Sequence, residues 1–167
     1  MESRFIRPHF RIAHEALIET VDDYRDIKGL EVKPPAVKRY FVRVKPEVLT
    51  QFRKERGLDL LSSADVEKEF IYQNTYKLNL CFYSSLGEKK AFVLSHGRNI
   101  MILKIVGYAE QVAQYYKLEN FDAHIWIAHQ RYPTRGRVWH PGGAHPFIGL
   151  DEALVHNGDF ANYYSVS

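Results

Sequence analysis

AHQRYPTRGRVWHPGGAHPFIGLDEALVHNGDF, residues 128–160, is the stretch of sequence that decides the predicted fold. An apolar run over residues 124–128 predicts a buried strand that ends near Arg131. The residues that follow are too rich in glycine and proline for regular structure, so they predict a loop. A second apolar segment, residues 153–155, predicts another strand, which leads into a turn at residues 156–159. Because both predicted strands end in polar clusters, the pattern favours a site held on a rigid scaffold.

The rest of the chain predicts helices mainly in its first half and strands mainly in its second half. The predicted helices cover residues 13–24, residues 46–56 between Pro46 and Gly57, residues 62–72 with Ser62 as the cap, and residues 109–116. The predicted strands cover residues 40–44, 78–83, 91–94 and 99–106, with turns at residues 85–88 and 96–99. Since helices and strands do not alternate steadily, the sequence predicts an α+β fold with an antiparallel sheet, in a single domain over residues 1–167.

The composition is that of an ordered globular chain with a modest charge. The net charge of +3, from 23 basic and 20 acidic residues, is too small to imply nucleic acid as a partner. Cys81 is the only cysteine, which excludes an internal disulfide and favours a reducing compartment, and its apolar neighbours predict that it is buried. No apolar run approaches the roughly 20 residues of a membrane span. We therefore expect a cytoplasmic protein whose partners include neither membrane nor nucleic acid.

Three short motifs in the C-terminal stretch resemble those of a known enzyme class. HQRYPT at residues 129–134, AHPF at 144–147 and HNGDF at 156–160 are similar to the HTR, AHP and HNG boxes of class II glutamine amidotransferases. The upstream segments SHGRN at 95–99 and VGY at 106–108 make the amidotransferase domain of glutamate synthase the most similar member. This resemblance implies the αββα sandwich of N-terminal-nucleophile hydrolases, of which this chain would hold the antiparallel-sheet part, incomplete at both ends.

The resemblance also implies an activity, the hydrolysis of glutamine to glutamate and ammonia, and assigns residues to it. Asn157 and Gly158 match the pair that stabilises the tetrahedral oxyanion. A side-chain amide and a backbone N–H at glycine suit that role, because they donate hydrogen bonds without a charge that must be neutralised. Arg131 matches the arginine that holds the α-carboxylate of glutamine, for which a guanidinium is well shaped. We therefore expect Arg131 and Asn157–Gly158 to converge on one pocket.

Further positions of the motifs match residues around the glutamine pocket. Tyr132 and Thr134 match positions that line it, His145 is expected to orient the loop, and Asp159, where the family often has glutamate, is expected to be structural. Gln130 replaces the usual threonine of the HTR box. Five histidines within 33 residues raise the alternative of a zinc site, but neither an HExxH motif nor a cysteine pair is present, so we expect no metal.

The nucleophile of this enzyme class is an N-terminal cysteine whose own α-amino group serves as the base. No cysteine lies near Met1, and Cys81 lies in mid-chain, where it has no free α-amine. The sequence therefore predicts an internal fragment of a longer domain, or a truncated gene product, that is inactive alone. The partner expected by resemblance is a glutamate synthase catalytic domain or subunit, which would carry the cofactors, so none is expected in this domain. Two alternatives stay open: a non-catalytic glutamine-binding or interaction module, and the amidotransferase domain of another class II enzyme.

Overall fold

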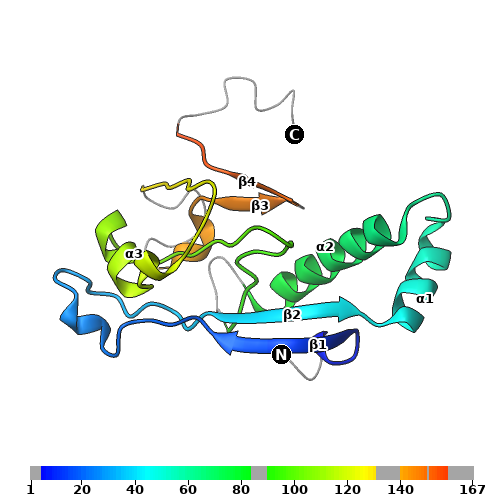
Figure 1. Cartoon of the computed structure of the whole chain (residues 1–167), viewed down its shortest axis with the longest axis horizontal. Coiled ribbons are helices and arrows are strands. Elements are labelled where there is room, and N and C mark those ends of the chain that lie inside the picture. The colour runs from blue at the N-terminus through cyan, green and yellow to red at the C-terminus, as the bar shows by residue number, and fades with distance from the viewer. Residues whose placement is uncertain (1–4, 84–89, 131–139, 150, 158–167) are drawn as a thin grey trace.

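The computed structural model describes residues 5–83, 90–130, 140–149 and 151–157. Within these residues the fold is α+β, as predicted, with two small antiparallel sheets of two strands each. Figure 1 shows the first sheet along the long axis of the molecule, with helices α1 (Pro46–Arg56) and α2 (Ser63–Phe82) towards one end and α3 (Ala109–Tyr115) towards the other. The second sheet lies between them. None of the helices in the described ranges is both long and apolar enough to cross a membrane.

The first sheet pairs β1 (Phe10–Leu17) with β2 (Lys38–Val44), in a register that runs from Phe10 opposite Val44 to Leu17 opposite Lys38. The strand predicted over residues 40–44 is therefore confirmed. The helix predicted over residues 13–24 is wrong, because its apolar spacing is overridden by pairing with β2. Strand pairing satisfies those backbone groups of β1 that face β2, and Phe10 and Val44 are buried together in one core cluster.

The two longer helices form a hairpin against this sheet. Helix α1 (Pro46–Arg56) begins with proline in its first turn and ends at Gly57, whose φ of 63° is the left-handed conformation that favours glycine. Both ends agree with the prediction. Helix α2 (Ser63–Phe82) begins at the predicted cap, Ser62, whose hydroxyl accepts a hydrogen bond from the N–H of Asp65.

Helix α2 is longer than predicted. It continues past residue 72 and includes most of residues 78–83, which were predicted as a strand, so that prediction is wrong. Neither glycine nor proline interrupts residues 63–82, and the i→i−4 ladder therefore continues without a break. Leu78 is buried on its inner face, but Cys81 points to solvent, which corrects the prediction of a buried cysteine.

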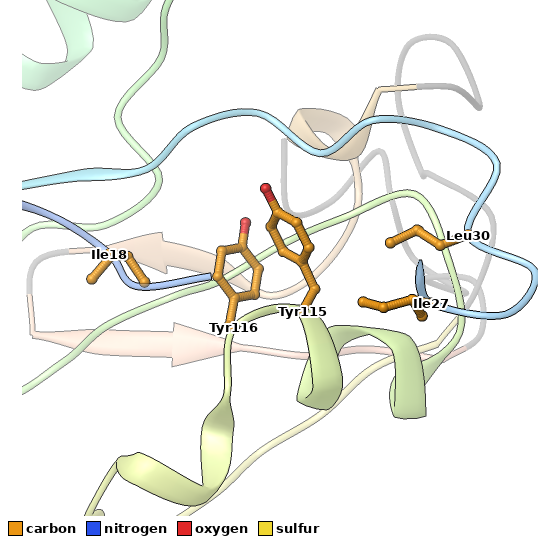
Figure 2. Packing of buried hydrophobic residues seen from close by; sticks show 5 residues of the cluster. All are labelled: Ile18, Ile27, Leu30, Tyr115 and Tyr116. Atoms are coloured by element: carbon orange, nitrogen blue, oxygen red, sulfur yellow. The ribbon is translucent and has the colours of Figure 1, made fainter. Parts of the chain in front are cut away.

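A second core forms around α3 (Ala109–Tyr115), which confirms the helix predicted over residues 109–116 to within one residue. Figure 2 shows Tyr115 and Tyr116 beside Ile18, Ile27 and Leu30, and all five side chains are buried. The described ranges also contain three single-turn 3-10 helices, η2 (Tyr24–Asp26), η3 (Leu118–Asn120) and η4 (Pro141–Gly143).

Residues 90–108 and 121–130 hold no strand, although three were predicted there. Residues 91–94, 99–106 and 124–128 have no ladder partner among the described residues, so those three predictions are wrong. The run over residues 124–128 was predicted to be buried, yet Ile125 and Trp126 are 81% and 57% exposed. The glycine-containing segment 96–99 is bent, in agreement with the predicted turn, and residues 85–88 lie outside the described residues.

The second sheet pairs β3 (Phe147–Gly149) with β4 (Glu152–Leu154), with Phe147 opposite Leu154. The strand predicted over residues 153–155 is thus confirmed, shifted by one residue. Strand β4 is followed directly by Val155 and by the first two residues of the HNG motif, His156 and Asn157.

The start of α2 gives a test of the local structure. Ser62→Ala removes the acceptor for the N–H of Asp65, and we expect it to lower the free energy of unfolding by about 0.5–2 kcal/mol in urea titrations. Ser62→Thr keeps a hydroxyl that can accept from the N–H of Asp65 and donate to the Asp65 carboxylate, and it should unfold within about 0.5 kcal/mol of the wild type. Equal stability of the alanine and wild-type proteins would show that the cap contributes nothing.

Candidate functional site

Two motif segments, residues 128–130 and 155–157, together line an open pocket of about 540 Å³. The pocket is lined by Ala128, His129, Gln130, Val155, His156 and Asn157. These segments are separated by 24 residues or more in the sequence, so only the tertiary structure brings them together. The polar side chains at this pocket carry amides and imidazole rings, which can form hydrogen bonds.

His129 joins the two segments directly. Its Nε2 lies 3.0 Å from the backbone oxygen of His156, a hydrogen-bond distance at which the ring nitrogen must be the donor, because a carbonyl can only accept. The other ring nitrogen, Nδ1, is buried and has no hydrogen-bond partner among the described residues. His129 is therefore oriented by its contact with the segment that carries Asn157.

His145, which belongs to the AHP motif, contacts the last residue of β4. Its Nδ1 lies 3.2 Å from the backbone oxygen of Leu154, and its ring centroid lies 4.9 Å from that of His129. On its other side the ring packs at 4.6 Å against Phe147. The sequence assigned His145 to the orientation of the loop, and the structure places it between β3 and the end of β4.

Gln130, which replaces the usual threonine, has a definite partner. Its Oε1 accepts a hydrogen bond of 3.1 Å from the backbone N–H of Ala109, the first residue of α3. The first N–H groups of a helix lack partners within the helix, and a side-chain oxygen is a usual substitute. Gln130 therefore ties the pocket to the N-terminus of α3 while it also lines the pocket.

Lys104 contacts the AHP motif and was not among the predicted site residues. Its side chain is 7% exposed, its Nζ donates a hydrogen bond of 2.6 Å to the backbone oxygen of Ala144, and it lies 4.9 Å from the centre of the Phe147 ring. Burial lowers its pKa to about 8. No carboxylate forms an ion pair with it in the described part of the chain. The one sequence signal was a single lysine within the apolar run of residues 100–106.

The structure describes only part of the predicted site. Asn157 lies at the pocket and is exposed, and His145 lies 4.9 Å from the pocket residue His129. Five predicted site residues lie outside the described residues: Arg131, Tyr132, Thr134, Gly158 and Asp159. In the sequence, Arg131 follows Gln130 and Gly158 follows Asn157, and both of these neighbours line the pocket. The described residues contain no group of three or more histidine, cysteine, aspartate or glutamate side chains that could hold a metal ion.

Comparison with known proteins gives a relative that is considerably longer than this chain. The chain is 34% identical over 131 residues to an uncharacterized protein of Archaeoglobus fulgidus. The match covers 78% of this chain but 30% of the relative, so most of the relative lies outside the matched region. No family model matches the sequence, and no solved structure matches it.

The buried ammonium of Lys104 predicts a pH dependence of stability. Its pKa is about 8 in the folded protein and about 10.5 when unfolded, so between these values the unfolded chain binds more protons and stability rises with pH. Relative to Lys104→Met, which lacks the charge, the wild type should gain about 1–3 kcal/mol in free energy of unfolding between pH 7.5 and 10. Chemical denaturation of both proteins across this range measures the gain, and a constant or falling difference would contradict it.

Proposed function

We propose that this chain is part of the class II glutamine amidotransferase domain of a glutamate synthase-like protein, and that the pocket between residues 128–130 and 155–157 binds glutamine. One observation supports the proposal: His129 and Gln130 of the HQR motif and His156 and Asn157 of the HNG motif, far apart in the sequence, line a single pocket, and His129 contacts the carbonyl of His156. A pocket at this place is what the resemblance requires of those two motifs.

The groups at the pocket suit the chemistry of amide hydrolysis. Attack on the side-chain amide of glutamine produces a tetrahedral oxyanion, which needs hydrogen-bond donors fixed in advance. In the proposal the side-chain amide of Asn157 and the backbone N–H of Gly158 are these donors. Arg131 holds the α-carboxylate through its guanidinium, Tyr132 and Thr134 line the remaining wall, and Asp159 has a structural role.

The larger context is part of the same proposal. The two small antiparallel sheets and flanking helices belong to an αββα sandwich of the N-terminal-nucleophile type, and the chain works in the cytoplasm. The ammonia is used by a glutamate synthase catalytic domain or subunit, which carries the cofactors of the synthase reaction, while this domain itself uses no cofactor.

The cysteine content favours a second candidate, a glutamine-binding module that does not catalyse hydrolysis. Cys81, the one cysteine of the sequence, lies exposed near the C-terminal end of α2 and has no free α-amine to serve as a base. Both candidates share the glutamine pocket and differ only in whether a cysteine nucleophile acts there. For the 167-residue chain itself they make the same prediction: glutamine binds, and no hydrolysis follows.

Calorimetric titration of the chain with L-glutamine tests the pocket. Arg131→Ala should weaken binding by at least about tenfold, because a charged hydrogen-bonded pair with the α-carboxylate is lost. Asn157→Ala should change the Kd by less than about threefold, because the oxyanion exists only during reaction. Arg11→Ala, at an exposed position on β1, is the matched arginine control.

The ligand can be varied in the same way. 4-Aminobutanamide, which keeps the amide and amine of glutamine but lacks the carboxylate, should bind wild type and Arg131→Ala equally weakly. If L-glutamine shows no binding to the wild type, or if both arginine variants bind it alike, the pocket is not a glutamine site of this kind.

Hydrolysis is tested separately by incubating the chain with glutamine and measuring ammonia. We expect no ammonia above the background of a buffer blank, since the chemistry needs a cysteine with its own α-amine as base. Cys81→Ser is the control. Ammonia production that the wild type shows and Cys81→Ser loses would refute the expectation and would make Cys81 a nucleophile.

A further inference from the structure

Among the described residues, the segment that carries Asn157 is contacted by side chains rather than by a neighbouring strand. The register of the second sheet places Phe147 opposite Leu154, so Pro146 would stand opposite Val155 and His145 opposite His156 if the ladder continued. Proline has no N–H to donate, and β3 begins only at Phe147. The backbone ladder therefore stops one residue before Val155, just ahead of the HNG motif.

Two histidine rings contact the backbone oxygens at this point. His145 Nδ1 lies 3.2 Å from the oxygen of Leu154, and His129 Nε2 lies 3.0 Å from the oxygen of His156. The two contacted carbonyl groups are two residues apart in the sequence, on either side of Val155. The rings also pack on each other, with centroids 4.9 Å apart.

We propose that His129 and His145 are positioning residues that fix the end of β4 and the segment after it through these two carbonyl groups, and so hold Asn157 at the pocket. This proposal deepens the proposed function and rests on it for the role of Asn157. The positioning of the segment by the two histidines rests on the contacts alone. Each ring comes from a different motif, one from HQR and one from AHP. The three motifs of the C-terminal stretch are thereby joined into one unit.

The chemistry of the contacts specifies which ring nitrogen matters at each position. At residue 129 the donor is the distal nitrogen, Nε2, and its Nδ1 has no partner among the described residues. At residue 145 the contact is made by the proximal nitrogen, Nδ1. Glutamine places its amide nitrogen close to the position of Nε2, and asparagine places it close to the position of Nδ1. Conservative substitutions should therefore work at one position and fail at the other.

Hydrogen exchange of the backbone amides of His156 and Asn157, measured on the full chain without ligand, tests this. His129→Leu should speed exchange about five- to tenfold, the usual effect of one lost hydrogen bond, whereas His129→Gln should stay within about threefold of wild type. His129→Asn should behave like the leucine variant, because its amide is too short. At residue 145 the order should reverse: His145→Asn should keep the exchange rate close to that of the wild type, and His145→Gln should raise it.

Thermal melts of all variants separate a local change from global unfolding. If a leucine variant fails to fold, the comparison of His129→Gln with His129→Asn still tests the proposal, because both side chains are polar amides that differ only in length. Equal exchange in His129→Gln and His129→Asn would overturn the proposal. Glutamine titration of the same variants then tests the functional part: His129→Leu should weaken binding about fivefold or more and His129→Gln should not. A wild type that binds no glutamine would refute the proposed function and leave the exchange result standing.

Discussion

Backbone groups that no sheet ladder satisfies must find hydrogen-bond partners elsewhere, and this constraint shapes the second half of the molecule. Residues 90–108 contain no strand, yet most of this segment is buried or partly buried. Side chains take over the role of neighbouring strands. Asn79 Oδ1 accepts from the N–H of Val93, and Ser95 Oγ accepts from the N–H of Ile102.

The candidate site is built by the same means. Lys104 binds the carbonyl of Ala144, His145 contacts that of Leu154, and His129 contacts that of His156. Hydrogen bonds from side chains depend on single residues, whereas a ladder is repeated along a strand. The geometry of this pocket is therefore controlled by a few identifiable side chains, and substitutions there should act locally.

The two cores explain why the site sits where it does. One core packs the β1–β2 sheet against the α1–α2 hairpin, and the other packs α3 against the segment around Ile27 and Leu30. Gln111 joins α3 to that segment by a hydrogen bond of 2.9 Å from its side chain to the carbonyl of Lys28, and Gln130 joins the pocket to the first turn of α3. The pocket is thus attached to the second core by its own side chains.

The sequence by itself determined the features whose causes lie within a few residues. Pro46 and Gly57 bound one helix, Ser62 starts the next, and residues 40–44 form a strand, because caps, turn residues and strand alternation act locally. The motifs also indicated that the HQR and HNG segments belong to one site, and residues of both line one pocket, although Arg131 and Gly158 themselves lie outside the described residues.

Only the tertiary structure decided the features that depend on distant partners. Residues 10–17 are a strand because Lys38–Val44 pairs with them, and no local signal carries that information. Residues 78–82 stay helical because they continue α2, while the apolar residues 124–128, which look like a buried strand, remain exposed and unpaired in the described structure. The roles of His129, Gln130 and Lys104 likewise follow from contacts with residues 21 to 40 positions away. Burial and pairing are properties of the folded chain, so the spacing of apolar residues alone could not specify them.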